Sequence, residues 1–250
     1  MRLKACLNGG RSRAEHPAVP LSPAELARDA LGATTAGAEA VHLHPRGTDG
    51  LESLAAVDIG AAVGAVRAAC ARTPIGVSTG LWIAGGDPAR RHELVAAWAS
   101  LAPGDRPDFA SVNVSEPGFV ELVELLLSLD VGVEPGVWSV ADVPLLSTVD
   151  GSWQRVLVEV IDEPAATAVA VADDILDRLD EAGVRGPRLL HGEGDACWPL
   201  VEHAGRRGLP TRIGLEDTLV APDGGAVRGN AELVRWGVER WEAAQDSVRP

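Results

Sequence analysis

Short apolar runs alternate along the chain with longer segments that have the composition and boundaries of helices. Apolar runs bounded by turn residues predict buried strands, and the capped segments between them predict helices. The runs predict strands at residues 3–8, 40–46, 75–80, 109–115, 131–139, 155–160, 188–194 and 210–217. The intervening segments predict helices at residues 23–37, 57–72, 88–101, 118–130, 164–182, 196–207 and 230–245, with a short helix from residue 141.

The start of the first helix carries a specific local signal. Ser22 is suited to the N-cap, Pro23 to the first helical position and Glu25 to the third. A serine followed three residues later by a glutamate forms a capping box, in which each side chain accepts a hydrogen bond from the backbone of the other residue. The sequence therefore predicts that this helix begins at residue 23.

Eight strands and eight helices in strict alternation predict one fold class. Alternation implies a parallel sheet with right-handed crossovers. A (β/α)8 barrel typically needs about 250 residues, and the chain has 250. We therefore expect a single-domain (β/α)8 barrel over residues 1–250, with an open doubly wound sheet as the alternative.

Charge and composition exclude several classes of function. The chain has 22 Lys and Arg against 36 Asp and Glu, a net charge of −14. Nucleic acids and anionic membranes attract basic surfaces, so we expect neither as a partner. The N-terminus lacks the apolar stretch of a signal peptide, and no apolar run is long enough to span a membrane, so we expect a cytoplasmic protein. Lys4 is the only lysine and lies at the start of a strand, which disfavours a Schiff-base aldolase.

Polar residues gather where the predicted strands end. The active sites of such barrels lie at the carboxyl ends of the strands. The polar residues there are Asn8, His42, His44, Arg46, Ser78, Thr79, Ser111, Asn113, Ser115, Glu134, Glu159, Asp162, His191, Glu193, Arg212, Glu216 and Asp217.

Two histidines in this group form a candidate metal site. His42 and His44 are two residues apart on one strand, so both imidazoles point to the same face, ~6.6 Å apart along the strand. Catalytic zinc sites commonly use three protein ligands, and two histidines with one glutamate are one such set. Barrel closure brings the last strand near the second, which makes Glu216 the candidate third ligand. Fe(II), Mn and Co also suit these ligands.

Several short motifs occur in order along the chain and resemble those of the β-keto acid cleavage enzymes. The motifs are HLHPR at 42–46, STG at 78–80, SVN at 111–113 and RIGLED at 212–217, followed by NAELV at 230–234. The resemblance spans nearly the whole chain, from Leu3 to Trp236, and extends to 3-keto-5-aminohexanoate cleavage enzyme, the first named member of the family. It implies a zinc-dependent (β/α)8 barrel that condenses a β-keto acid with acetyl-CoA, giving acetoacetate and a new acyl-CoA.

The resemblance also implies roles for individual residues. His42, His44 and Glu216 would hold zinc, and Asp217 would act as the base, oriented by Arg212. The keto acid would contact a set of residues at the strand ends: Asn8, Ser78, Thr79, Gly80, Ser111, Asn113, Glu134 and His191. Glu216 and Asp217 have opposite parity along a strand, so both reach the pocket only if the strand ends or twists there. A homo-oligomer, either dimer or tetramer, is expected from the family.

The sequence departs from the first named member at two places. The loop after the first strand carries Arg11 and Arg13 where that enzyme has a glutamate, and His191 stands in a stretch that is apolar there. Trp82, Trp138 and Trp198 follow three of the strands, where they are expected either to pack against long loops or to line an apolar pocket. Two other functions stay open at this point. One is a metal-dependent hydrolase of the amidohydrolase kind, disfavoured because strands four to six lack histidine, and the other is a ligand-binding barrel without catalysis.

Overall fold

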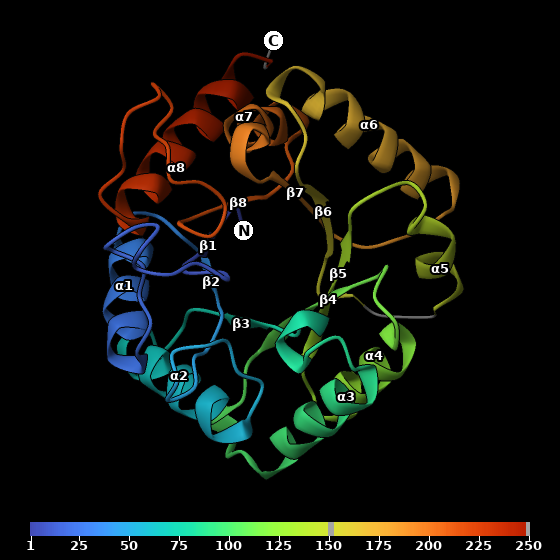
Figure 1. The fold of residues 1–250 in the computed structure, drawn as a ribbon. Coiled ribbons are helices and arrows are strands. Elements are labelled where there is room, and N and C mark those ends of the chain that lie inside the picture. The colour runs from blue at the N-terminus through green and yellow to red at the C-terminus, as the bar shows by residue number, and fades with distance from the viewer. Residues whose placement is uncertain (150–152, 249–250) are drawn as a thin grey trace.

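The computed structural model describes residues 1–149 and 153–248. Within these ranges, eight parallel strands form a ring with eight α-helices outside it, as Figure 1 shows in a view along the barrel. The strands are β1 (Leu3–Cys6), β2 (Ala40–Leu43), β3 (Ile75–Ser78), β4 (Phe109–Asn113), β5 (Gly132–Val137), β6 (Val156–Val160), β7 (Arg188–Gly192) and β8 (Thr211–Ile213). The helices are α1 (Pro23–Thr35), α2 (Ala56–Ala69), α3 (Pro88–Ala96), α4 (Phe119–Ser128), α5 (Val143–Thr148), α6 (Ala165–Glu181), α7 (Cys197–Arg207) and α8 (Asn230–Asp246). The predicted (β/α)8 barrel is confirmed.

The ring closes between the last two strands. Strands β1 to β7 pair in chain order, and β8 pairs with β1. Leu190 N donates a hydrogen bond to Pro210 O at 3.0 Å, and Thr211 Oγ1 donates one to Leu190 O at 2.8 Å. These bonds join β7 to β8, so the alternative of an open sheet is wrong.

Five strands end two residues earlier than the apolar pattern predicts, whereas β2 ends three and β8 four residues earlier. β2 ends at Leu43. The next backbone amide, His44 N, donates its hydrogen bond to the side-chain oxygen of Asn8 at 2.9 Å and not to a neighbouring strand. β8 ends at Ile213, because Gly214 starts a helical turn in which Thr218 N donates to Gly214 O at 3.1 Å. Both early ends move site residues from strand geometry into turn geometry.

The capping box at the start of α1 is present as predicted. Ser22 Oγ accepts a hydrogen bond from Glu25 N, and Glu25 Oε2 accepts one from Ser22 N at 3.0 Å. The helix begins at Pro23. In the described part of the chain, no helix has both the length and the apolar character needed to cross a membrane.

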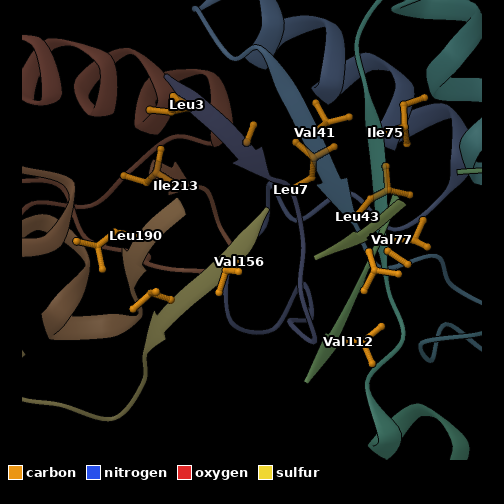
Figure 2. Close-up of a cluster of buried hydrophobic side chains, with 14 of the residues drawn as sticks. Leu3, Leu7, Val41, Leu43, Ile75, Val77, Val112, Val156, Leu190 and Ile213 are labelled. Carbon is orange, nitrogen blue, oxygen red and sulfur yellow. The ribbon is translucent and has the colours of Figure 1, made fainter. Parts of the chain in front are cut away.

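The hydrophobic core lies between the strands and the helices. Every second strand residue points away from the barrel axis, into this core. Examples are Val41, Leu43, Ile75 and Val77, and Figure 2 shows several of these side chains together. A strand turns successive side chains to opposite faces, so the residues between them point into the barrel. The outward-facing side chains of the strands therefore form the apolar core, and the inward-facing side chains are free to be polar or charged.

The lower interior of the barrel is charged. Lys4 pairs with Glu134 across the barrel, and both side chains are fully enclosed. Arg155 Nε lies 3.0 Å from Glu134 Oε1, and the cations of Lys4 and Arg155 lie 5.5 and 5.4 Å from the centre of the Phe109 ring. Buried charges persist only when they are paired, and each charge here has a partner. This layer forms the floor beneath the candidate site.

Candidate metal and active site

A cavity of about 290 Å³ opens at the carboxyl ends of the strands. Strands β2, β3, β4, β6 and β8 contribute to it directly, and the loops after β1, β5 and β7 complete its wall. It is lined by Gly9, Gly10, Arg11, Glu15, His42, His44, Ser78, Trp82, Ser111, Asn113, Trp138, Glu159, Ile161, Glu193, Arg212 and Glu216.

His42, His44 and Glu216 converge in this cavity. The Nε2 atoms of the two histidines lie 3.2 Å apart, and Glu216 Oε2 lies 4.0 Å from His42 Nε2 and 3.6 Å from His44 Nε2. Zinc binds histidine nitrogen at about 2.0–2.1 Å with tetrahedral geometry, which places two such ligands roughly 3.3 Å apart. The three donor atoms therefore have the spacing of a metal site.

The hydrogen bonds around these residues also suit a metal ligand set. His44 Nδ1 lies 2.5 Å from Glu52 Oε1. A carboxylate that accepts the Nδ1 proton leaves the lone pair of Nε2 directed at the site, as in many zinc centres. Glu216 Oε2 accepts no hydrogen bond from any residue in the described ranges, although it is buried. A cation between the three residues would satisfy this oxygen.

The electrostatics of the site favour a cation. Burial lowers the pKa of His42 well below its ordinary value, so this imidazole is neutral and able to ligate. Burial also acts to lower the pKa of His44, but the carboxylates of Glu216 and Glu52 outweigh it and raise the pKa to about 9. The carboxylates that raise this pKa would equally attract a metal cation. The three residues fit a divalent metal ion.

A second group of possible ligands fits less well. Cys6, Glu216 and Asp217 also lie close enough together to hold an ion. Burial raises the pKa of the Cys6 thiol well above its ordinary value. A thiol that stays protonated is a poor metal ligand, so the histidine group suits a metal ion better than this second group does.

Because β8 ends early, Glu216 and Asp217 are not on a strand and do not have to point to opposite faces. Both residues lie in the turn after Ile213, where Asp217 N donates to Gly214 O at 2.9 Å. Glu216 faces the cavity, whereas Asp217 lies beneath it and is fully buried. Gly9 allows the loop after β1 to approach: its φ is +50°, and a Cβ there would lie 2.5 Å from Glu216 Cγ.

Arg212 binds three carboxylates at once. Its Nη2 donates to Glu216 Oε1 at 2.8 Å and to Asp217 Oδ1 at 2.6 Å, while Nη1 lies 3.6 Å from Glu159 Oε2. Because the guanidinium is planar and keeps its charge, it fixes these carboxylates relative to one another. We call Arg212, Glu159, Glu216 and Asp217 the Arg212 cluster.

Asp217 is enclosed within this cluster. It has no exposed surface and does not line the cavity. Burial raises its pKa to about 6, against the opposing effect of the Arg212 charge. The structure therefore places Asp217 behind Arg212 rather than on the cavity surface.

Ser78, Ser111 and Asn113 lie on the cavity wall. Thr79 and Gly80 do not line the cavity, but each donates a hydrogen bond to a serine that does. Thr79 Oγ1 donates to Ser111 O at 2.6 Å, and Gly80 N donates to Ser78 Oγ at 3.2 Å.

Three other predicted contact residues lie outside the cavity wall. Asn8 is fully buried, and its side chain binds both backbone atoms of His44, accepting from N and donating to O at 2.9 Å each. Glu134 is committed to Lys4 and Arg155 in the barrel floor. His191 lies beneath the surface, with Nε2 2.9 Å from Glu159 Oε2. Each is held by an internal partner and does not face the cavity.

Two of the three tryptophans that follow strand ends line the cavity, and the third does not. Trp82 and Trp138 line the cavity and are 50% and 38% exposed. Trp198 does not, because its indole nitrogen donates to Val220 O at 2.8 Å outside the cavity. Arg11 from the loop after β1 also lines the cavity and donates through Nε to Glu216 O at 3.2 Å.

Sequence reasoning did not assign a role to two residues that matter here. Glu52 lies in the loop after β2, and its approach to His44 depends on that loop folding back, so no local pattern predicts it. Glu159 stands at the end of a predicted strand, which was a signal for it, and it lines the cavity next to Trp138.

Comparison with known proteins identifies a family for this chain. A sequence model of the family described as beta-keto acid cleavage enzyme matches residues 2–187 and 189–249. No curated protein matches the sequence.

Solved structures share the fold at low sequence identity. The ternary complex of ObcA with a C4-CoA adduct and oxalate has a TM-score of 0.73 and 18% identity, over 89% of this chain and 63% of that chain. The binary complex of ObcA with oxaloacetate has a TM-score of 0.70 and 18% identity over the same shares. Rubisco from Pyrococcus horikoshii OT3 has a TM-score of 0.60 and 12% identity, over 99% of this chain and 60% of that chain. The chain thus spans somewhat less than two thirds of the length of ObcA, and these structures support the barrel fold.

Proposed function

The chain belongs to the beta-keto acid cleavage enzyme family, and from this premise we propose that it is a metal-dependent enzyme that exchanges acyl groups between a β-keto acid and acetyl-CoA. In this reaction the C2–C3 bond of the keto acid breaks, and C2 forms a bond to the acetyl carbonyl carbon. The CoA sulfur passes from the acetyl group to C3. The products are acetoacetate and a new acyl-CoA, and the atoms balance without an oxidant or reductant.

The observation that carries this proposal is the convergence of His42, His44 and Glu216 beside Arg212 at the mouth of the barrel. A divalent ion held there, which we expect to be zinc, would polarise a carbonyl group as a Lewis acid. ObcA has been solved with oxaloacetate, which is itself a β-keto acid, and with a CoA adduct. That similarity supports the same classes of substrate here.

Arg212 supplies positive charge where the reaction develops negative charge. Removal of a C2 proton leaves an enolate, and a fixed cation beside the cavity stabilises it without reorganising during the reaction. Because Arg212 also binds Glu216, the cation and the metal ligands are held in a fixed relation.

The remaining wall suits a small acid. Ser78, Ser111 and Asn113 carry hydroxyl and amide groups that donate hydrogen bonds to a carboxylate. Trp82 and Trp138 provide apolar surface above them. The step also needs a carboxylate base near Arg212, and the structure offers Asp217 and Glu159 there.

An isotope experiment tests this function. The protein is incubated with acetyl-CoA carrying 13C in both acetyl carbons and with unlabelled β-keto acids of different length and terminal charge. We expect acetoacetate labelled at C3 and C4, together with an equal amount of a new unlabelled acyl-CoA. Hydrolysis would instead give free carboxylic acids with no new acyl-CoA, and that result would contradict the proposal.

A further inference from the structure

Glu116 lies just behind the cavity wall and outside the motifs of the family resemblance. It belongs to the loop between β4 and α4. Its carboxylate accepts hydrogen bonds from Asn113 Nδ2 at 2.9 Å and from Leu81 N at 3.1 Å. Leu81 begins the helical turn that carries Trp82, and both Asn113 and Trp82 line the cavity. One carboxylate therefore holds two separate parts of the cavity wall.

A buried arginine fixes the orientation of this carboxylate. Arg91 lies on α3 with 1% of its side chain exposed, and its Nη1 pairs with Glu116 Oε2. The guanidinium is itself held by two backbone carbonyls, because Nη1 donates to Thr79 O at 3.3 Å and Nη2 donates to Pro117 O at 2.7 Å. Glu116 therefore keeps Oε2 directed at Arg91, and its Oε1 is the oxygen that meets Asn113.

This pairing decides which way the Asn113 amide faces. An ionised carboxylate accepts hydrogen bonds and cannot donate them, so the amide turns its nitrogen toward Glu116. The amide oxygen then faces β5, where Oδ1 lies 2.9 Å from the position that a Cβ on Gly136 would take. Among the residues that the structure describes, none donates a hydrogen bond to this oxygen. Asn113 thus presents an acceptor at the cavity wall, while its second N–H stays available to a substrate carboxylate.

A second acceptor lies beside the first. The same Cβ position on Gly136 is 2.5 Å from Glu159 Oε1. This oxygen accepts one hydrogen bond, from Trp138 Nε1 at 3.3 Å, and a carboxylate oxygen can accept two. We call Asn113 Oδ1 and Glu159 Oε1 the acceptor pair. Two acceptors that converge beside a residue without a side chain suit a hydrogen-bond donor on a bound molecule, either a hydroxyl or an ammonium group.

The acceptor pair lies across the barrel from the candidate metal site. The metal ligands are on β2 and in the turn after β8, whereas the acceptor pair is on β4 and β6. In the ring of eight strands, β4 lies opposite β8 and β6 lies opposite β2, as Figure 1 shows. A β-keto acid whose keto and carboxylate oxygens lie at the metal site would extend the chain beyond C3 toward the acceptor pair.

We propose that Glu116, anchored by Arg91, is a positioning residue that turns the Asn113 oxygen toward the cavity, so that the acceptor pair selects β-keto acids with a hydroxyl or ammonium group on the chain beyond C3. This inference rests on the proposed function, since it names the substrate class of the same site.

Glu116→Gln tests the orientation because Arg91 constrains the new side chain. The guanidinium only donates, so the glutamine must keep its oxygen toward Arg91 and turn its NH2 group toward Asn113. The Asn113 amide then has to turn over, which replaces the oxygen of the acceptor pair by an NH2 group. Adding Asn113→Asp to Glu116→Gln reverses this change, because the aspartate accepts from the glutamine with one oxygen and presents the other to the cavity.

The measurement is the ratio of kcat/KM values for matched substrates in the metal-loaded protein. 3-Oxohexanoate is compared with its derivatives that carry a hydroxyl or amino group at C4, C5 or C6, with acetyl-CoA as the second substrate and acetoacetate formation as the readout. Because the ratio is taken within each protein, a general loss of activity or stability cancels. Glu124→Gln, an exposed carboxylate-to-amide change on α4, is the matched control. Asn113→Ala removes the acceptor and gives the same readout if Glu116→Gln does not fold.

We expect wild type and Glu124→Gln to prefer at least one donor-bearing acid over 3-oxohexanoate by about 10-fold, the effect of one hydrogen bond in an enclosed site. Glu116→Gln and Asn113→Asp should each lose this preference, the second because two carboxylates then face each other, and the double variant should regain it. A wild type that cleaves these acids without preference, a Glu116→Gln variant that keeps the preference, or a double variant that does not regain it would overturn this inference alone. A wild type that forms no acyl-CoA from any β-keto acid would overturn the proposed function and this inference with it.

Discussion

At the scale of single residues, His44 is held from several sides. Asn8 binds its backbone N and O, Glu52 meets its Nδ1, and the Trp82 ring stacks on it with ring centres 6.5 Å apart. A ligand that is already held in place loses little conformational freedom when an ion binds. Hydrogen-bond partners of metal-bound histidines therefore fix the orientation of the ring and also raise the affinity for the metal.

Removing the charge on Glu52 is expected to weaken metal binding. Glu52→Gln should raise the dissociation constant for zinc about 10- to 100-fold, the range found for lost partners of metal-bound histidines. Competition with a chromophoric chelator measures this constant. Asp49→Asn, an exposed change in the same loop, should leave it unchanged, and equal affinity in wild type and Glu52→Gln would refute a role for Glu52.

Filling the space at Gly136 is expected to damage catalysis while sparing the fold. Gly136→Ala would place a methyl group 2.5 Å from Glu159 Oε1, so the carboxylate must shift, and misplacement of about 1 Å can cost roughly 100-fold in rate. Turnover and metal content are measured together. Gly104→Ala, at a glycine with open space around it, is the control. Full activity of Gly136→Ala would contradict the placement described for Glu159.

At this scale the sequence predicts part of the site. The spacing of His42 and His44 within one strand led directly to the metal hypothesis, and closure of the barrel supplied Glu216. The sequence did not separate Glu134 from the cavity residues, because its partners Lys4 and Arg155 meet it across the barrel and not along the chain. Residues that converge from separate strands and loops leave no local pattern.

At the scale of elements, strand ends decide which side chains face the cavity. The order and type of the elements were predicted, because apolar runs and caps are local signals. The ends of β2 and β8 were predicted three and four residues too late, since the Asn8 side chain and the turn at Gly214 replace strand hydrogen bonds there. In β8 this difference allows Glu216 to face the cavity while Asp217 lies beneath it.

The capping box of α1 should contribute measurably to stability. Ser22→Ala removes the side-chain acceptor for Glu25 N, and losses of this kind cost about 1 kcal/mol in the free energy of unfolding. Urea denaturation measures this change. Ser128→Ala, at the end of α4, should change stability by less than about 0.5 kcal/mol. Equal stability of Ser22→Ala and wild type would show that the cap is not used in solution.

A partly buried aspartate between α1 and α8, Asp29, should make stability depend on pH. Burial raises the pKa of Asp29 to about 6, and Asn230 Nδ2 donates to its Oδ2 at 2.5 Å. Because the folded-state pKa lies above the unfolded value, the folded state holds this proton more tightly, and the stabilisation is lost as pH rises from about 4 to about 6. Asp29→Asn removes this effect, so its stability relative to wild type should increase between pH 4.5 and pH 7.5. A difference that is the same at both pH values would contradict the raised pKa.

At the scale of the whole molecule, we expect metal binding and folding to be coupled. The candidate ligands come from β2, from the loop after it and from the turn after β8, so the site exists only when the barrel is closed. A ligand that binds only the folded state stabilises it by about 2.7 kcal/mol at a concentration 100 times its dissociation constant. For a chain of this size each kcal/mol corresponds to roughly 2–4 °C.

Metal removal should therefore lower the melting temperature by roughly 5–10 °C. Scanning calorimetry of the zinc-loaded protein, with and without EDTA, measures this shift. In His42→Ala the shift should disappear, because the ligand set is broken. A shift of equal size in His42→Ala would place the metal elsewhere in the molecule.

The central claim is that His42, His44 and Glu216 hold a metal ion on which β-keto acid cleavage depends. It is tested most directly by measuring metal content and acetoacetate formation from acetyl-CoA and β-keto acids in the same preparations of wild type and His42→Ala. We predict one bound divalent ion per chain and steady turnover in wild type, with both lost in His42→Ala. A wild-type protein that is purified metal-free after metal-replete expression, or that turns over equally well in His42→Ala, would contradict the claim.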